Sequence, residues 1–363
     1  MKKAKKILQV LYSGLGGHGT VAFSLLNGFY KAGFENHLIF YGIESINTNY
    51  VEQIEKEKKV NSYFGIKKTT KTGVKEWIKF YKQLKKIQPD FIILHSPQLI
   101  IPAYIYHLFH KTKIITVEHD AISIRTHSKW IVTNVNAILA DKIIVLTDFY
   151  KKEVEKKLWI SKLIKKYYVI PNGIDIDKYK PNNNIFSNRK IRLFMASRMN
   201  ILRDHITLIE TVKKIHQTNS DILLRIAGDG PTLSSLKEKY SSLNFIHFLG
   251  NITENEIINE LQQIDIYIHA TFAETFSTAI LQAMSCALPV IVSDIEGTRH
   301  MIQHKENGLV FENKNVLDLQ NKIYNFLNDN DFARKMGKQA RKVVENNYDM
   351  KIIIQKYLKL LEQ

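Results

Sequence analysis

The feature that most constrains the fold of this chain is an alternation of short, β-rich apolar runs with segments of helical periodicity, found in both halves. The runs of the first half are KILQVLY, HLIFY, DFIILHS, KIITVEH, KIIVLT and YYVIP. Those of the second half are IRLFMAS, ILLRIAG, NFIHFLG, DIYIHAT, PVIVSD and GLVF. Strands that alternate with helices form parallel sheets with helices on their faces. The sequence therefore predicts two α/β domains in tandem.

The two halves meet in PNGIDIDKYKPNNNIFSNRK, residues 171–190, where Pro, Asn and Gly accumulate and no periodicity is visible. We predict an N-terminal domain over residues 1–170, a linker over 171–190, and a second domain from residue 191. A length of 363 residues suits two domains. Ligands of such sheets bind beyond the carboxyl ends of the strands, so we expect a cleft between the domains.

Charge is distributed unevenly along the chain. Residues 1–180 hold 30 Lys and Arg against 15 Asp and Glu, whereas residues 181–363 hold 22 against 20. A basic first half predicts a surface for anionic partners such as diphosphates or lipid headgroups. A lysine-rich genome is the alternative explanation, but it should load both halves alike. We expect no nucleic-acid partner, because no RNA- or DNA-binding module accompanies the basic residues.

Several classes of protein are not expected. No apolar run reaches the roughly 18 residues that span a bilayer, and the apolar part of the start is too short for an export signal. We therefore expect a cytoplasmic protein that could lie peripherally on the inner face of the cell membrane. The lone Cys286 cannot form an internal disulfide or a cysteine-held zinc site.

A glycine-rich stretch, SGLGGHGTVAF, follows the first predicted strand. Glycines between a strand and a helix let backbone N–H groups approach an anion at the positive end of the helix. We expect Gly16 and Gly17 to lie against a diphosphate. GLGGHG also satisfies the spacing G-x-G-x-x-G, so a nicotinamide-dependent enzyme is an alternative, although Glu44 is only loosely placed to bind a ribose. A plain tight turn is the third interpretation.

The segment 270–297 carries the most chemical information. A strand ends at His269, a loop carries Glu274, and Ser277 or Thr278 is expected to cap a helix that runs to about Cys286. A phosphate at that helix start would meet free amides and a favourable dipole. Because helical side chains tilt toward the N-terminus, Glu274 and Gln282 can reach one ligand. Carboxylate and amide groups suit hydroxyls.

This segment, ETFSTAILQAMSCALP, resembles the signature of the family-4 retaining glycosyltransferases of the GT-B fold, two glutamates separated by seven residues. Glu274 matches the first glutamate, which implies a contact with the hydroxyls of the donor sugar. The second, which holds the nucleotide ribose, is replaced by Gln282. An amide hydrogen-bonds a diol without the strength of a charge-assisted bond.

The resemblance also implies the architecture. The GT-B fold consists of two Rossmann-like parallel-sheet domains that face each other across a cleft. The nucleotide-sugar-binding domain is then expected over residues 191–345. Residues 346–363, with the sequence YDMKIIIQKYLKLLEQ at their end, match a terminal helix that crosses back to the N-terminal acceptor domain.

Further matches extend the resemblance over most of the chain. SRMNILRDHITLIE is similar to the family's R-x-x-x-x-K stretch, which implies that Arg198 and Arg203 straddle the diphosphate and stabilise the leaving group. A pair of solvated surface arginines is the alternative. VIPNGIDIDKY is similar to the interdomain PNGVD element, so Asp175 and Asp177 are interpreted as structural rather than metal-binding.

The remaining site residues follow from the same resemblance. His119, at the end of IITVEH, matches the active-site histidine beside the anomeric carbon, although such a histidine taken alone is usually a plain polar contact. The other matches are expected to bind the donor nucleotide: Gly228 in IAGDGP, Gly250 and Asn251 in FLGNIT, and Phe276, Ser277 and Thr278 after Glu274.

The expected function is transfer of a hexose or N-acetylhexosamine, with its configuration kept, from a nucleotide-diphosphate sugar, UDP being favoured over GDP. The acceptor is expected to be a glycan or a lipid-linked glycan of a cell-surface polysaccharide pathway. We expect neither a metal nor a cofactor beyond the nucleotide-sugar co-substrate, because the arginines and helix amides can supply positive potential. A sugar-nucleotide-binding homologue with little activity is the alternative, because Gln282 and Ala287 depart from the pattern.

Two basic segments could contact an anionic membrane. VKEWIKFYKQLKKI, residues 74–87, is expected to form a helix with Val74, Trp77, Ile78, Tyr81 and Leu84 on one face and lysines on the other. The preferred interpretation is that this apolar face packs on the first sheet and the basic face is solvated. Residues 151–168 are the second candidate.

Overall fold

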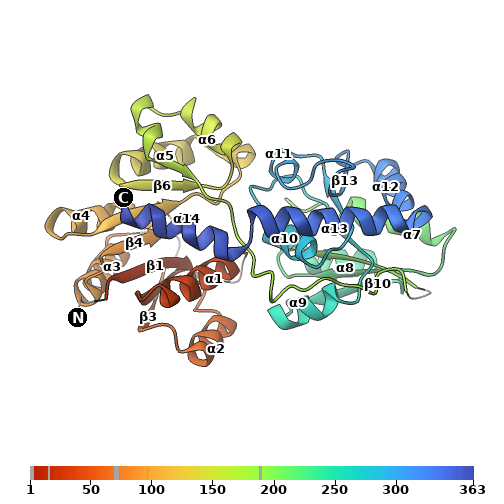
Figure 1. The fold of residues 1–363 in the computed structure, drawn as a ribbon, viewed down its shortest axis with the longest axis horizontal. Helices are drawn as coiled ribbons and strands as arrows, with labels where there is room; N and C mark the ends of the chain where they lie inside the picture. Colours follow the sequence, from red (N-terminus) through yellow and green to blue (C-terminus); the bar gives the residue numbers. More distant parts are fainter. Residues whose placement is uncertain (1–3, 15–16, 69–72, 96, 188–189) are drawn as a thin grey trace. The chain divides into compact units, whose positions relative to one another are not determined.

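The computed structural model describes residues 4–14, 17–68, 73–95, 97–187 and 190–363, and it confirms the predicted fold class. The described residues form a seven-stranded and a six-stranded sheet, and neighbouring strands are paired in parallel. The chain divides into two compact units (Figure 1). The first unit comprises Met1–Asn172 with Met350–Gln363, and the second comprises Gly173–Asp349.

The sheet of the first unit has the strand order β3-β2-β1-β4-β5-β6-β7. Its strands are β1 (Lys6–Tyr12), β2 (Glu35–Gly42), β3 (Ser62–Lys67), β4 (Phe91–Leu94), β5 (Lys113–Val117), β6 (Lys142–Val145) and β7 (Tyr167–Val169). Its helices are α1 (Gly17–Lys31), α2 (Thr48–Glu57), α3 (Val74–Ile87), η1 (Pro97–Leu99), α4 (Ile100–Phe109), η2 (Ile122–Ile124), α5 (His127–Leu139), α6 (Asp148–Glu155), η3 (Ser161–Lys166) and α14 (Met350–Glu362).

Both faces of this sheet are covered, because successive residues of a strand point to opposite sides. Leu8 and Val10 of β1 pack with α3, α4, α5 and α6 in one apolar cluster. Leu11 packs on the other side with α1 and α2. The strands therefore form near-continuous apolar runs, as expected for a parallel sheet buried on both faces.

Helix α14 packs against α1, so the end of the chain belongs to the first unit (Figure 1). The rings of Phe29 and Tyr357 meet edge to face at 6.2 Å between centroids. A Cβ on Gly28 would lie 2.1 Å from Ile354 Cδ1, so a larger residue there would require the isoleucine side chain to shift. Lys142 Nζ donates to Leu360 O at 2.6 Å.

The second unit has the strand order β10-β9-β8-β11-β12-β13. Its strands are β8 (Ile191–Ala196), β9 (Ile222–Ala227), β10 (Ile246–Gly250), β11 (Ile266–His269), β12 (Val290–Ser293) and β13 (Leu309–Phe311). Its helices are α7 (His205–His216), α8 (Leu233–Lys239), α9 (Glu254–Leu261), α10 (Thr278–Ser285), α11 (Glu296–Arg299), α12 (Val316–Asn328) and α13 (Asn330–Asn347).

Most of the predicted linker, residues 171–190, packs on the second unit. Tyr179 is fully buried, and Asn182 Nδ2 donates to Leu261 O at 3.2 Å and to Ile264 O at 3.0 Å. Arg341 NH1 donates to Tyr179 O at 2.6 Å. Residues 188–189 lie outside the described part of the chain. These contacts explain why the second unit begins at Gly173.

The structure corrects the face that was predicted for the helix over residues 74–87. Helix α3 has the expected bounds, but its buried residues are Phe80, Leu84 and Ile87. Trp77, Tyr81 and Leu84 of the predicted face pack on the core as expected, whereas Val74 and Ile78 are exposed at 66% and 51%. The helix turns its Phe80 side to the sheet because the large ring of Phe80, together with Leu84, buries more apolar area than Val74 and Ile78 would bury in the same place.

Candidate functional site

The second sheet reverses its winding between β8 and β11, and the loops after these two strands carry five of the predicted site residues. β8 is followed by residues 197–204, with Arg198 and Arg203, and β11 by residues 270–277, with Glu274, Phe276 and Ser277. Ligands of doubly wound sheets bind at such a switch point, beyond the carboxyl ends of the strands. Arg203 and Thr271 form an isolated antiparallel bridge that joins the two loops.

The structure brings Arg203 and Glu274 together. Arg203 NH2 lies 3.1 Å from Glu274 Oε2, and both side chains are largely buried, with 18% and 14% exposed. Arg203 NH1 also donates to Thr271 Oγ1 at 2.5 Å and to Ala273 O at 2.6 Å. Its Nε is buried and has no hydrogen-bond partner among the described residues. The guanidinium is therefore fixed on one edge and retains an unused donor.

Glu274 is held as a carboxylate. Burial alone would raise its pKa, but Arg203, His269 and the backbone N–H of Thr275 offset this and lower the pKa of Glu274 to about 2. His269 Nε2 lies 3.4 Å from Glu274 Oε2, and Thr275 N donates to Glu274 Oε1 at 3.0 Å. Burial lowers the pKa of His269, and that of His205 in α7 to about 4. The site thus contains a carboxylate and an arginine beside neutral imidazoles.

Gln282 has a different set of contacts. It lies on α10, and its Nε2 donates to the Tyr179 hydroxyl at 2.8 Å, which in turn donates to Glu254 Oε1 at 2.9 Å. Burial, followed by Glu254, raises the pKa of Tyr179 well above its ordinary value. The amide of Gln282 therefore joins helix α10 to α9 through the buried tyrosine.

Helix α10 begins as the sequence predicts, and the structure decides between the two candidate caps. Ser277 is the N-cap, and its hydroxyl accepts from Ile280 N at 3.3 Å. Thr278 is the first helical residue, and Phe276 packs edge to face on Tyr348 with centroids 5.1 Å apart. The first amides of a helix have no intrahelical acceptor, so this end can bind an anion.

Ala287, where glycine is usual in the family, lies just beyond the end of α10 with φ of 55°. Helices commonly end with a residue in this left-handed conformation, and glycine adopts it without strain. The departure therefore costs about 1 kcal/mol of local strain.

Gly228 lies where the loops after β8 and β9 touch. Its φ is +136°, and a Cβ there would lie 1.8 Å from Ser197 O. Gly250 is the last residue of β10 and Asn251 follows it, and Gly250 O accepts from Gly228 N at 2.7 Å. The backbones of these residues therefore lie together beside the loop that carries Arg198. The side chain of Arg198 is exposed.

In the first unit, His119 belongs to a polar relay that joins Gln9, inside β1, to residues just beyond β4 and β5. Gln9 Nε2 donates to Ala22 O at 3.4 Å, so Gln9 Oε1, 3.2 Å from His95 Nε2, is an acceptor. His95 Nε2 must then carry a proton, and its Nδ1 accepts from His119 Nε2 at 3.0 Å. Burial lowers the pKa of His119 to about 4. Burial thus keeps His119 neutral, and the relay places its proton on Nε2, which makes Nδ1 the acceptor.

A buried ion pair fixes the residue that precedes His119. Glu118 accepts from Arg125 NH2, from Asn136 Nδ2 at 3.0 Å and from the Tyr150 hydroxyl at 3.4 Å. Arg125 also stacks on the rings of Trp130 and Tyr150, each 5.3 Å from its guanidinium carbon. These contacts anchor the end of β5 and the start of the loop that follows.

The glycine-rich stretch is only partly described. Gly17 is the first residue of α1, whereas Gly16 lies outside the described residues. The packing of the chain explains why residue 19 is a glycine, because a Cβ there would lie 2.0 Å from the Tyr50 hydroxyl.

The pair Asp175 and Asp177 forms part of a turn. Asp175 Oδ1 accepts from Asp177 N at 3.0 Å and from Lys178 N at 3.2 Å.

Sequence reasoning missed several polar residues of these clusters, among them His95, His269 and Gln9. His95 directly follows β4, and His269 ends β11. Both carry the signal that identified His119, a polar side chain at the carboxyl end of an apolar strand. Gln9 could have been found as the one polar residue inside the run ILQVL.

The Glu274 carboxylate predicts how the stability of the chain depends on pH. Because its pKa falls from 4.5 to about 2 on folding, ionised Glu274 stabilises the fold fully above pH 4.5, and this contribution is lost as the pH falls toward about 2. Near neutral pH, Glu274→Gln is expected to lower the free energy of unfolding by about 3 kcal/mol. Urea unfolding of both proteins should show this difference shrink in acid. A difference that stays constant over the whole pH range would contradict the assignment.

No helix in the described part of the chain is long and apolar enough to span a bilayer.

Two family models match the chain. The model described as Glycosyltransferase Family 4 matches residues 15–178, and the model described as Glycosyl transferases group 1 matches residues 175–343.

Several known proteins are similar over most of their length. An uncharacterized glycosyltransferase of Methanocaldococcus jannaschii is 25% identical over 322 residues, which is 80% of this chain and 79% of that protein. The Escherichia coli UDP-Gal:alpha-D-GlcNAc-diphosphoundecaprenol alpha-1,3-galactosyltransferase is 26% identical over 302 residues, 76% of each chain. The crystal structure of Anabaena HepE in complex with UDP and glucose superposes with a TM-score of 0.82 at 18% identity, covering 99% of this chain and 100% of that one. This similarity confirms the GT-B fold.

Proposed function

Because the chain belongs to glycosyltransferase family 4, we propose that it transfers a hexose or N-acetylhexosamine, with retention, from a nucleoside-diphosphate sugar to a glycan or lipid-linked acceptor. UDP is the proposed nucleotide, and cell-surface polysaccharide is the proposed product. The similar Escherichia coli enzyme, named for a UDP-sugar and a diphosphoundecaprenol-linked acceptor, supports the choice of UDP and of a lipid-linked acceptor.

The observation that carries this proposal is the Arg203–Glu274 pair at the switch point of the second sheet. Arg203 has a buried Nε that lacks a partner among the described residues, and an oxygen of a bound diphosphate would satisfy it. Glu274, with its pKa lowered to about 2, accepts hydrogen bonds from the hydroxyls of the sugar. The N-terminus of α10 adds amides to the anion site.

The proposed chemistry depends on stabilising the leaving group. As the bond from the anomeric carbon to the diphosphate oxygen breaks, negative charge grows on that oxygen, and Arg198, Arg203 and the helix amides stabilise it. The acceptor oxygen forms the new bond to the anomeric carbon, and its proton passes to the departing phosphate. In this proposal the positive potential comes from the protein, so no metal and no cofactor beyond the nucleotide sugar takes part.

His119 is proposed to position the sugar. Burial keeps its ring a neutral imidazole, and the relay through His95 and Gln9 makes Nδ1 the acceptor. A neutral imidazole can accept a hydrogen bond from a sugar hydroxyl without adding charge beside the oxocarbenium-like transition state. Gly16, Gly17, Gly228, Gly250, Asn251, Phe276, Ser277 and Thr278 complete the proposed donor contacts.

A second candidate function is sugar-nucleotide binding with little transfer. Two observations favour it: Gln282 donates to Tyr179, and Ala287 adopts a left-handed conformation at the end of α10. The same donor contacts would then serve recognition rather than turnover.

Thermal unfolding with a panel of UDP- and GDP-sugars tests the proposal. A donor at about one hundred times its dissociation constant should stabilise the fold by about 2.7 kcal/mol, a shift in Tm of several degrees. Arg203→Ala should abolish the shift, whereas Lys237→Ala, an exposed residue of α8, should retain it. No shift with any nucleotide sugar would contradict both candidate functions, and binding without transfer to any acceptor would favour the second.

A further inference from the structure

The exposed apolar side chains of this protein are concentrated on one face of the first unit. Helix α4 exposes Ile101, Ile105, Leu108 and Phe109, the last two at 59% and 74%. Its sequence, IIPAYIYHLF, contains no charged residue. A surface helix normally carries a polar outer face, and one that is apolar all round is normally buried. The outer face of α4 is therefore that of a buried helix.

The apolar surface continues onto the neighbouring elements. Helix α4 packs between α3 and α5, and α5 packs against η3. The other exposed apolar side chains of this surface are Val74 and Ile78 of α3, Ile131, Val132 and Ile138 of α5, and Trp159 and Ile160 before η3. In the described part of the second unit, the large apolar residues that are exposed are only Ile201, Ile206 and Leu317. We call this surface of the first unit the α4 face.

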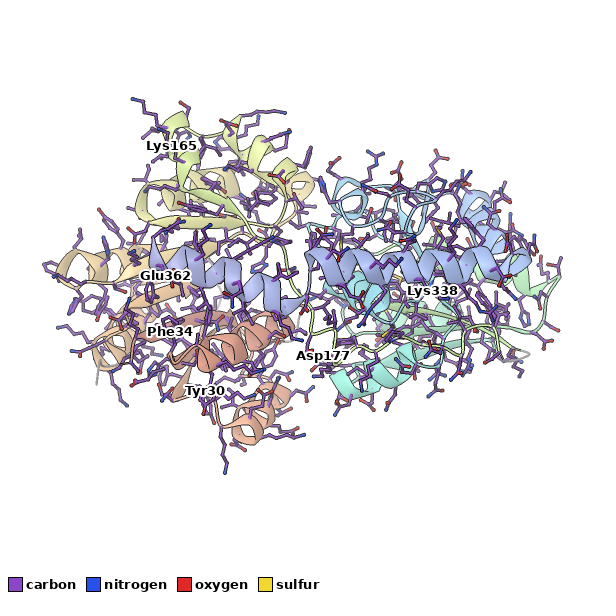
Figure 2. All side chains as sticks on the ribbon, in the orientation of Figure 1. Tyr30, Phe34, Lys165, Asp177, Lys338 and Glu362 are labelled. Carbon is purple, nitrogen blue, oxygen red and sulfur yellow. The ribbon has the colours of Figure 1, made fainter. Side chains whose placement is uncertain are left out.

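Lysines border the α4 face, whereas acidic residues are few. Helix α3 contributes exposed Lys75, Lys79, Lys82, Lys85 and Lys86 against one glutamate, Glu76. Residues 91–117 and 156–174 contain no Asp or Glu. Lys165 of η3 extends from the other side (Figure 2). Lys85 lies over the ring of Tyr81, which contacts the buried Tyr106 of α4, so the lysine-bearing helix α3 packs directly beside α4.

We infer that the α4 face docks on an anionic lipid bilayer, with the apolar stripe of α4 and α5 inserted between the lipids and the lysines of α3 on the headgroups. A helix in the membrane plane buries its apolar side while long lysine side chains reach the phosphates. A second copy of the chain would bring the same lysines to the interface, and their repulsion opposes such a dimer. The inference rests on the proposed function, because a lipid-linked acceptor lies at the membrane.

Flotation with vesicles tests this inference. The full chain should float with vesicles of phosphatidylcholine and phosphatidylglycerol in equal parts, and only weakly with phosphatidylcholine alone. Leu108→Ser combined with Phe109→Ser should weaken binding to the anionic vesicles at least about 100-fold, because the transfer of each large apolar side chain contributes a factor of roughly ten or more. Lys82→Gln combined with Lys85→Gln should weaken it about 10-fold, and added salt should remove that difference.

A matched control uses exposed apolar residues of the first unit away from α4. Tyr63 and Phe64 of β3 are exposed at 40% and 39%, and their double serine variant should bind vesicles within about 2-fold of the unmodified chain. Equal loss in the control and in the Leu108 and Phe109 variant would overturn the inference, as would no loss in either. A concentration-dependent dimer that the same variant dissociates, without vesicle binding, would instead assign the face to self-association.

The failure of this inference can be told apart from failure of the proposed function. The thermal shift produced by UDP-sugar does not need a membrane and should be the same in the Leu108 and Phe109 variant. Vesicle binding without any donor shift would leave the α4 face established and the glycosyltransferase assignment wrong. A thermal shift with the donor but no vesicle binding would support the proposed function and overturn the inference about the α4 face.

Discussion

Replacing Glu274 with alanine is expected to lower kcat/KM for sugar transfer at least about 100-fold, the loss typical of removing a preorganised polar group from a transition-state site. The substitution removes the carboxylate that binds the sugar hydroxyls in the proposed mechanism. It also removes the partner that holds Arg203 NH2 at 3.1 Å. Transfer should be measured with the donor that gives the largest thermal shift.

The control separates chemistry from stability. Glu274→Gln keeps the shape of the side chain but not its charge, and Glu256→Gln makes the same change at an exposed residue of α9. Glu256→Gln should leave transfer unchanged. If Glu274→Ala stays folded by circular dichroism and retains full transfer, the catalytic centre does not lie at this pair. A double-mutant cycle with Arg203→Ala should show strong coupling in kcat/KM.

Gly228→Ala is expected to cause the largest loss of stability among single substitutions near the site, about 3 to 5 kcal/mol. The residue has φ of +136°, a conformation that side chains rarely adopt, and its Cβ would lie 1.8 Å from the backbone oxygen of Ser197. A backbone atom cannot rotate away as a side chain can. The loop that carries Arg198 must therefore move, and donor binding should weaken together with stability.

Gly250→Ala is the matched control for this prediction. Gly250 also has a positive φ, +69°, but nothing lies within 4 Å of the Cβ that alanine would add. Its expected cost is the strain of a left-handed residue, about 1 kcal/mol. Urea unfolding of the two variants compares conformational strain with a steric clash. Equal losses would show that the contact between the loops after β8 and β9 is not tight.

Some elements of the fold were predicted and others were not, for reasons that differ from case to case. The buried strands, such as β6 and β12, are continuous apolar runs and could be read directly. Strand β3 was missed because it lies at the edge of the sheet and its sequence, SYFGIK, is exposed at every position except Ile66. An edge strand needs no apolar run, so composition gives little signal.

The site shows the same division. A short helix capped by Ser277 could be predicted because capping depends on residues within one turn. The pairing of Arg203 with Glu274 joins residues 71 positions apart, and it exists because β8 and β11 are neighbours in the sheet. The tyrosine that binds Gln282 comes from the segment predicted as a linker, more than one hundred residues away.

The sequence by itself determined the α/β class, the division into two sheets, the start of α10 and the family. These follow from periodicity and local motifs, which act over a few residues. The tertiary structure alone decided that Arg203 neutralises Glu274, that His95 and Gln9 set the tautomer of His119, and that the outer face of α4 is left exposed. The physical reason is that hydrogen bonds, ion pairs and burial depend on which segments the strand order brings together, and strand order is a property of the whole domain.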